Sequence, residues 1–342
     1  MTHIDIDAHW DLEARGYLQI GRHPSHPLLI HNYSQTTQYE RNWTLETLMS
    51  RGLITDLEGR VVARPFGKFF NLDEHVGLMG PVPEEPFEVY EKMDGSLGII
   101  FHWDGKHEIA TRGSFQSDQA IKATEIFAKK YAHLQLNPEH TYLVEIIYPD
   151  NRIVVDYGGL EDLVLLAVME TATGRELPLM DIGLPLVRRY DGVSDLEALR
   201  SIQEDNKEGF VVRFKSGLRV KLKFEEYVRL HRIVTGVNTR TVWEALMTGE
   251  SLEAFLERVP DEFYKWVRNV EADLREQFQA IEETCKREFR TFETRKEAAA
   301  YFQAACTYPA ILFRMLDGRP YDEIIWKLIR PEHQKAFSAD AE

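Results

Sequence analysis

The chain has 342 residues, of which 44% are hydrophobic and 28% are charged. This length and apolar content allow one large domain or two ordinary ones with a real core, and they argue against an intrinsically disordered chain. The formal net charge of −15 argues against attraction of nucleic acid by the whole surface, so such binding would need a local concentration of basic residues.

The sequence shows no sign of secretion or of membrane contact. Its first residues contain neither a basic region nor an apolar core, which argues against a secretory signal. The most apolar stretch, residues 163–169, is too short to span a bilayer and is predicted to be a buried strand. Two lone thiols, Cys285 and Cys306, fit a reducing cytosol better than a disulfide framework. We therefore expect a cytoplasmic protein, with a monomer as the working expectation although the sequence does not fix the oligomeric state.

Short β-rich segments alternate with turn residues up to about residue 235. Strands are predicted at 87–90, 97–103 and 107–111, and a helix at 117–133. Two hairpins are predicted, one joining 142–148 to 153–157 and the other joining 210–214 to 218–224. This part of the chain is therefore assigned to the α+β class, with antiparallel sheets flanked by helices.

After residue 235 the pattern becomes helical. Apolar residues recur at steps of three and four from Phe263 to Phe289, which is the stripe of a long amphipathic helix. Shorter helices are predicted over 295–305 and 321–329. We therefore divide the chain into an α+β catalytic domain, residues 1–235, and an all-helical C-terminal domain, residues 236–342.

The residues most suggestive of chemistry surround Lys92. The segment Glu91-Lys92-Met93-Asp94-Gly95-Ser96 contains a Lys-x-Asp-Gly motif. About one chain in ten of this length has such a motif by chance, and a turn that ends a strand also explains it. Its weight comes from charged residues that follow inside apolar strand patterns, namely Glu145, Glu208, Lys221 and Lys223.

Lys221 and Lys223 lie two residues apart, so both side chains point to the same face of a strand. A solvent-facing edge strand is one explanation for this pair, and a bound anion between the two ammonium groups is the other. A lysine with a pKa of about 10.4 is uncharged in about one molecule in a few thousand at neutral pH. Cationic neighbours lower that pKa, as a lysine that attacks phosphorus requires.

Three acidic residues complete the set, because Asp94, Glu145 and Glu208 offer the carboxylate oxygens that hydrated magnesium prefers. A metal ion there would neutralise a triphosphate and orient pyrophosphate as the leaving group. Between Asp205 and Lys223, six basic residues stand against two acids, which we interpret as a focused basic groove.

These motifs resemble the RNA ligase family typified by the first RNA ligase of T-even phages, within the covalent nucleotidyltransferase superfamily. The ordered motifs of the superfamily stand here as Lys92-Met-Asp-Gly, the Glu145 strand, Glu208-Gly-Phe-Val and Lys221-Leu-Lys223. Residues 50–54, 63–72 and 149–154 are also similar to that family. The resemblance runs from about residue 32 to 231, and it implies a nucleotidyltransferase (ATP-grasp-like ligase) domain.

The resemblance also implies roles for individual residues. Lys92 would form a phosphoramide with AMP, with ATP and Mg²⁺ or Mn²⁺ as cofactors. Arg51 and Lys68 would bind the ATP phosphates, and Lys221 and Lys223 would bind the α-phosphate. Glu145 would contact the ribose or a metal-bound water, and Glu208 would contact a metal-bound water. Val211 would pack on the adenine, and Tyr227 matches a tyrosine that the family uses. Asp94 would help to orient the last step through metal or water. Arg112 departs from the pattern, which has lysine there, and its planar guanidinium keeps the charge with a different geometry.

The implied reaction joins 5′-phosphate and 3′-hydroxyl RNA ends through a lysyl-AMP and an RNA-adenylate, in RNA repair, with cleaved tRNA as a candidate substrate. DNA ligases and capping enzymes share the lysine chemistry but continue into a β-rich OB domain, where this chain reads as helical. A non-catalytic RNA-binding homologue is a further alternative, disfavoured because every charged position is present.

Two other features have simpler explanations. The basic cluster from Lys286 to Lys296 is interleaved with glutamates and is interpreted as a solvated helix face, with contact to a structured RNA as the alternative. His23-Pro-Ser-His26 lacks convincing metal spacing and is interpreted as a loop. The sequence names neither the physiological RNA, nor a requirement for a 2′-phosphate, nor the partner that prepares the ends.

Overall fold

The computed structural model describes residues 2–252, 256, 259 and 261–335. The chain divides into two compact units, residues 1–228 and 229–340. The boundary between the two units, at residues 228 and 229, lies within helix α7, Glu225–Gly236. The domain boundary predicted from the sequence, after residue 235, lies within the same helix.

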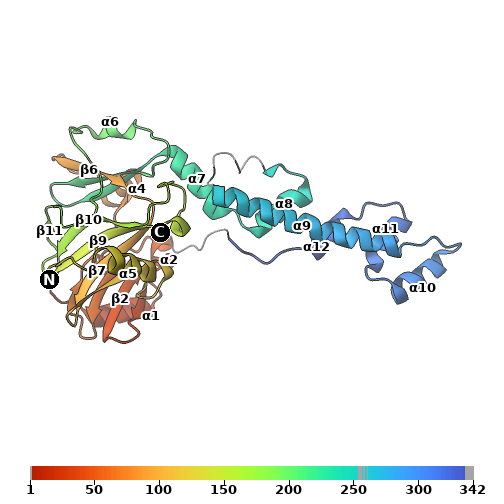
Figure 1. Ribbon diagram of the computed structural model, residues 1–342, viewed down its shortest axis with the longest axis horizontal. Coiled ribbons are helices and arrows are strands. Elements are labelled where there is room, and N and C mark those ends of the chain that lie inside the picture. The colour runs from red at the N-terminus through yellow and green to blue at the C-terminus, as the bar shows by residue number, and fades with distance from the viewer. Residues whose placement is uncertain (1, 253–255, 257–258, 260, 336–342) are drawn as a thin grey trace. The chain divides into compact units, whose positions relative to one another are not determined.

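The N-terminal unit is built on three sheets (Figure 1). The first has the order β1-β2-β3-β4: Leu18–Arg22, Leu28–Tyr33, Arg51–Asp56 and Val61–Ala63. The second has the order β11-β10-β9-β7-β8: Glu176–Leu177, Asp162–Glu170, His140–Ile147, Ser96–Trp103 and Lys106–Thr111. The third has the order β12-β6-β13-β14-β5: Arg189–Tyr190, Phe87–Lys92, Gly209–Phe214, Arg219–Lys223 and Phe70–Asn71.

The second sheet forms the centre of this unit because both of its faces are buried. Successive side chains of a strand point to opposite faces. Ile100 therefore packs with Ala123 and Ile126 of α5, whereas Ile99 packs with Ile30 and other residues of the first sheet. A strand covered on both faces is apolar along its whole length, which explains the apolar run 163–169. That run is β10, so the buried strand predicted there is confirmed.

Short helices connect these strands: α1 Ile6–Ala14, α2 Gln35–Glu40, α3 Leu45–Met49, α4 Leu72–Met79, α5 Asp118–Lys130, α6 Leu196–Arg200 and the 3₁₀ turn η1 Pro149–Asn151. The helix predicted over 117–133 is confirmed as α5. Ser117 caps it by accepting a hydrogen bond from the amide of Ala120, and lysines occupy its last turn, where they suit the helix dipole. The mixed α+β architecture, with antiparallel pairing dominant, agrees with the sequence-based expectation.

One predicted hairpin is confirmed and the other is wrong. β13 and β14 pair antiparallel as expected. Residues 153–157 form no strand, because β9 already pairs with β7 and β10 and the chain turns through η1 instead. Pro149 suits the first position of such a turn, where its missing N–H costs nothing. The amides of Val154 and Val155 donate to the carboxylate of Asp94 rather than to a strand.

The regular elements described within residues 229–340 are helices: α8 Thr239–Thr248, α9 Asp261–Glu288, α10 Arg295–Ala305, α11 Pro309–Leu316 and α12 Asp322–Leu328. The long amphipathic helix is confirmed as α9, whose apolar stripe buries Val267, Leu274 and Cys285. Sequence periodicity missed α8 and α11. α11 is short and begins at a proline, so its pattern is too brief to identify.

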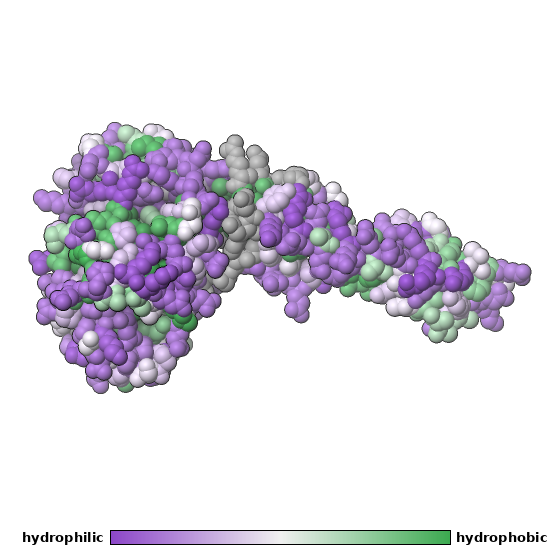
Figure 2. All heavy atoms as spheres, viewed as in Figure 1, coloured by the Kyte–Doolittle hydropathy of each residue, from purple (hydrophilic) through white to green (hydrophobic). Residues whose placement is uncertain are grey.

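Hydrophilic residues cover most of the visible surface of each unit (Figure 2). None of the described helices combines the length and the apolarity that a membrane span requires. The longest described helix, α9, is interrupted by charged residues throughout.

The third sheet depends on a close approach at Gly209, which has a φ of +144°. A Cβ there would meet the carbonyl oxygen of Leu222 at 2.0 Å and Cα of Lys223 at 2.8 Å. We therefore expect Gly209→Ala to lower the free energy of unfolding by more than about 3 kcal/mol. The substitution would strain the backbone at this positive φ and would push β13 away from β14. Gly217→Ala is the control, because φ is also positive there but no atom lies within 4 Å. Denaturant titration giving equal losses in both variants would contradict this prediction.

Candidate active site

Lys92 ends β6, and strand register brings it beside two other charged residues. Gly209 is paired with Lys92 on one neighbouring strand and with Lys223 on the other. Glu208, which immediately precedes Gly209, therefore reaches both lysines. Its Oε1 lies 2.6 Å from Nζ of Lys92 and 3.1 Å from Nζ of Lys223. Three residues that the sequence placed in separate motifs thus meet at one point.

This cluster is largely removed from water, since the side chain of Glu208 is only 3% exposed. The carboxylate of Glu208 and the side chain of Lys92 form an ion pair, with 2.6 Å between Oε1 and Nζ. This ion pair holds the side chain of Lys92 in place. A lysine that attacks phosphorus does so as the free amine, so such a role for Lys92 would need release of this contact.

Glu145 lies on β9 opposite Leu97 and faces the loop that follows Lys92. Its Oε1 accepts a hydrogen bond from the amide of Gly95 at 3.0 Å. Burial raises the pKa of Glu145 to about 7, although the charge of Lys92 opposes that rise. A carboxyl group that titrates near neutral pH can change its charge when a cation or a nucleotide arrives.

Asp94 is buried, and hydrogen bonds engage both of its oxygens. Oδ2 accepts from the amides of Val154 and Val155, at 3.0 and 2.8 Å, and Oδ1 accepts from the hydroxyl of Tyr227 at 2.8 Å. Burial and the charge of Glu208 raise the pKa of Asp94, against the effect of these hydrogen bonds. Asp94 thus lies beside the other two acids, with its lone pairs largely committed to the protein.

A second group of residues gathers around Tyr33, at the end of β2. Nζ of Lys68 and Nη1 of Arg112 lie 3.5 and 3.4 Å from its hydroxyl, and both cations also lie over its ring. Burial raises the pKa of Tyr33, but Lys68, Arg112 and Arg51 together outweigh burial and lower it overall. Sequence reasoning missed Tyr33, because an aromatic residue that ends a buried strand looks like an ordinary core residue.

The positive charges of Arg51 and Lys221 are not fully balanced by nearby acidic groups. Both lie over the ring of Phe69, at 5.7 and 5.1 Å from its centroid. Nη1 of Arg51 is buried and has no hydrogen-bond partner among the described residues. Burial lowers the pKa of Lys221 well below its usual value, and the neighbouring cations, Lys92 first among them, lower it further. Buried cations with an unsatisfied donor are the features of an anion site.

The two remaining residues predicted for this site lie beside these charges. Val211 is the direct cross-strand partner of Lys221, so both side chains face the same side of the third sheet. Tyr227 is buried, and Nζ of Lys223 lies 5.3 Å from its ring centroid. Tyr227 therefore contacts Asp94 and Lys223 at once. Every residue predicted for the site lies in residues 1–228.

The basic stretch 205–223 does not form one continuous groove, which corrects the interpretation from the sequence. Arg213 binds Glu88 and Glu176, and Arg219 also binds Glu176. Lys207 binds Glu204 at 2.6 Å and the hydroxyl of Tyr190 at 2.8 Å. Arg213 and Arg219 share a face with the lysines of the site but lie at the other end of β13 and β14, where glutamates neutralise them. Only Lys221 and Lys223 of this stretch join the candidate active site.

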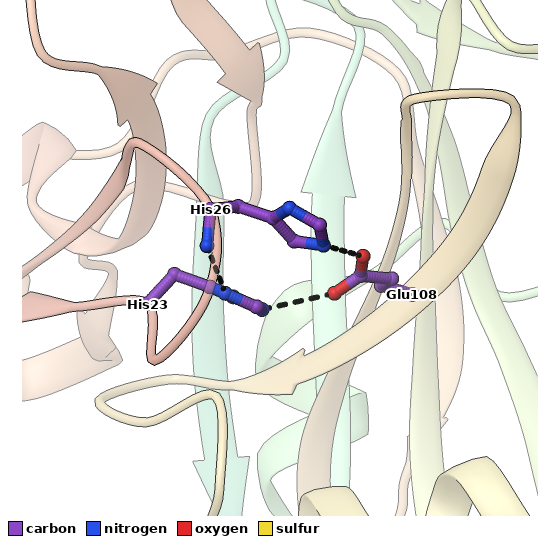
Figure 3. A group of neighbouring side chains, drawn as sticks. All are labelled: His23, His26 and Glu108. Atoms are coloured by element: carbon purple, nitrogen blue, oxygen red, sulfur yellow. Dashed lines mark hydrogen bonds and ion pairs between the residues drawn. The ribbon is translucent and has the colours of Figure 1, made fainter.

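Figure 3 shows a separate group, in which His23 and His26 from the loop after β1 meet Glu108 of β8. Nε2 of His23 and Nε2 of His26 lie 3.0 and 2.9 Å from the two oxygens of Glu108. Nδ1 of His23 accepts hydrogen bonds from the amides of Ser25 and His26, so its ring proton lies on Nε2. That ring has no lone pair left for a metal ion. The hydrogen bonds explain why the three side chains lie together, because they attach the loop that carries His23 and His26 to β8.

Comparison with known proteins gives consistent matches. Residues 49–181 match the model of a family described as RNA ligase. A protein of Thermovibrio ammonificans named "Putative RNA ligase" is 32% identical over 219 residues. The matched region covers 56% of this chain and 56% of the length of that relative. The RNA ligase of Rhodothermus phage RM378 is 23% identical over 321 residues, which cover 70% of this chain and 73% of the relative. An archaeal ATP-dependent RNA ligase structure is similar over 93% of this chain and 97% of its own, at 18% identity and a TM-score of 0.45.

The raised pKa of Glu145 predicts a pH-dependent cost to stability. Between its ordinary value of 4.5 and about 7, the folded protein keeps a proton that the unfolded chain has lost. Stability therefore falls as the pH rises through this window, by at most about 3.5 kcal/mol at roughly 1.4 kcal/mol per pKa unit. We expect Glu145→Gln to be more stable than the unsubstituted protein at about pH 8, with the difference shrinking towards about pH 4.

Urea denaturation across this pH range measures the difference. Glu125→Gln is the control, because the side chain of Glu125 is 67% exposed and lies on the outer face of α5. A Glu145→Gln difference that does not vary with pH, or that varies as it does for Glu125→Gln, would count against the burial of a titrating carboxyl group.

Proposed function

Because the chain belongs to the T4 RNA ligase-like family through residues 49–181, we propose that it is an ATP-dependent RNA ligase acting through a lysyl-AMP on Lys92. The observation that carries this proposal is the contact of Glu208 with both Lys92 and Lys223. This contact brings Lys92 next to a second cation, Lys223. Four further cations lie in the same region, and they are Arg51, Lys68, Arg112 and Lys221.

The first step is the attack of Lys92 Nζ on the α-phosphorus of ATP. A nitrogen–phosphorus bond forms, the bond to the bridging oxygen breaks, and pyrophosphate leaves with the electron pair. Lys221 and Lys223 counter the charge that develops on the α-phosphate oxygens. Arg51 and Lys68 hold the departing phosphates. Nη1 of Arg51 suits this role because it is buried and no described residue accepts a hydrogen bond from it. Val211, on the same face as Lys221, packs against the adenine.

The acidic residues fit a hard divalent cation such as Mg²⁺ or Mn²⁺. Glu145 and Glu208 would hold it, directly or through water, and Asp94 would contribute less because both of its oxygens already accept hydrogen bonds. Such an ion neutralises phosphate charge and orients the leaving group. If Glu208 held such an ion, its carboxylate would attract Lys92 less strongly, and the ion pair would be easier to release.

The later steps transfer AMP to RNA. The 5′-phosphate oxygen of one RNA end attacks the lysyl-AMP phosphorus, which frees Lys92 and gives an RNA-adenylate. The 3′-hydroxyl of the other end then attacks the 5′-phosphorus and AMP leaves. We propose RNA repair in the cytoplasm as the setting and cleaved tRNA as a candidate substrate. The helices of residues 229–340 would select it through backbone phosphates and shape.

Self-labelling tests the nucleophile. Incubation with magnesium and ATP labelled at the α-phosphate should give a covalently labelled protein, and Lys92→Ala should reduce the label by at least about 1,000-fold, because no other group replaces the attacking nitrogen. Lys122→Ala is the control, since Lys122 also forms ion pairs but lies on α5. Label that persists in Lys92→Ala would refute this assignment, and a folded protein that never labels would favour a non-catalytic RNA-binding homologue.

Substrate choice is tested separately. A 5′-phosphorylated single-stranded RNA should be circularised or joined, whereas the DNA of the same sequence should react at least about tenfold more slowly, because RNA-specific sites read the 2′-hydroxyl. A panel of nicked RNAs that includes a cleaved anticodon loop, with and without a 2′-phosphate, then ranks the substrates by initial rate. Equal activity on nicked duplex DNA would favour a DNA ligase instead.

A further inference from the structure

We infer that Tyr157 is a positioning residue for Lys92, acting through the loop Met93–Gly95. This inference rests on the proposed function. Tyr157 lies in the segment after η1, where the sequence predicted a strand of a hairpin and where the chain instead packs against the Lys92 loop.

The loop after Lys92 needs support from side chains because the strand ladders stop there. Lys92 is the last residue of β6 and Ser96 is the first residue of β7. The residues between them pair with no strand, so their conformation is set by other contacts. Gly95 shows how tightly the loop is held, because a Cβ at that position would meet the carbonyl oxygen of Ile146 at 2.6 Å.

Tyr157 supplies one of the hydrogen bonds that hold this loop. Its hydroxyl oxygen accepts from the amide of Asp94 at 2.7 Å. The carboxylate of Asp94 in turn accepts from the amides of Val154 and Val155, so the loop and the segment 154–157 exchange hydrogen bonds in both directions. A buried amide needs a partner, and within the described part of the chain the acceptor for Asp94 is this hydroxyl and not a backbone carbonyl. The hydroxyl of Tyr157 therefore fixes the backbone two residues after the nucleophile.

The ring of Tyr157 gives a second point of attachment. It packs against the apolar cluster of Ile147, Val164 and Val187, and the side chain of Met93 packs against the same cluster. The residue directly after Lys92 and the ring of Tyr157 are thus anchored on a common surface. Burial raises the pKa of Tyr157, so its hydroxyl stays neutral at physiological pH. The contact is a steady one that does not titrate in that range.

This arrangement bears on the attack of Lys92 and not only on folding. The position of Nζ depends on the backbone of Lys92. Strand pairing with Gly209 holds this backbone within the third sheet, and the loop Met93–Gly95 holds it from the following residues. Loss of the Tyr157 hydroxyl leaves the Asp94 amide unpartnered, and the loop shifts to find another acceptor. A misplacement of about 1 Å in a reacting group can slow the chemical step by about 100-fold.

The test is Tyr157→Phe, which keeps the ring and removes the acceptor. In single-turnover experiments with labelled ATP, we expect formation of the lysyl-AMP to slow by about 10- to 100-fold, while the affinity for a non-hydrolysable ATP analogue changes by less than about threefold. Joining of a chemically prepared RNA-adenylate bypasses the attack of Lys92, so this step should change by less than about threefold.

Tyr142→Phe is a matched control. The hydroxyl of Tyr142 also accepts a backbone amide at 2.7 Å, from Asn137, but its ring lies in the cluster on the α5 side of the second sheet. A purely structural role for Tyr157 predicts that both variants lose similar thermal stability and keep the same labelling rate. The positioning role predicts slow labelling for Tyr157→Phe alone.

The outcomes separate this inference from the proposed function. If the unsubstituted protein labels and Tyr157→Phe labels at the same rate, the positioning role is wrong and the ligase proposal stands. Slowing of labelling and of RNA-adenylate joining to the same extent would also overturn it, because that pattern indicates general damage to the site. If the unsubstituted protein never labels, the proposed function itself fails.

Discussion

The carboxylate of Glu208, held between the ammonium groups of Lys92 and Lys223, is the interaction on which the rest of the site depends. It joins adjacent strands of the third sheet at a point where Gly209 lets the backbones approach closely. Each of the two lysines needs a counter-charge because the cluster is shielded from water. One acid shared by two lysines leaves positive charge uncompensated, and that imbalance prepares the site for phosphate.

The same imbalance gives a chain with a net charge of −15 a local excess of positive charge, as the proposed binding of a polyanion requires. Acidic residues neutralise many basic side chains of the third sheet, as Glu176 does for Arg213 and Arg219. The cations around Tyr33 and Phe69 instead lie close enough to one another for their charges to interact. Local charge therefore matters more than net charge, because a low-dielectric cleft concentrates the field of the groups that line it.

The loop between β6 and β7 follows Lys92, the proposed nucleophile, and connects the third sheet to the second. Its backbone is held by Glu145 on one side and by Tyr157 on the other. These contacts explain why Glu145 and Asp94 stay close to Lys92 although each is engaged in hydrogen bonds. A loop without ladder pairing can place a side chain accurately only when such contacts replace the missing strand partner.

The sequence by itself determined the long helix α9, the β13–β14 hairpin and the order of Lys92, Glu145, Glu208, Lys221 and Lys223, because periodicity and motif spacing are local properties of the chain. Only the tertiary structure decided the contacts of Tyr33 and Tyr157 and the meeting of His23 with Glu108. Those contacts join residues far apart in the chain, and they depend on strand register and on packing between sheets. The hairpin predicted at 153–157 failed for the same reason, since its amides bind Asp94, about 60 residues earlier in the chain.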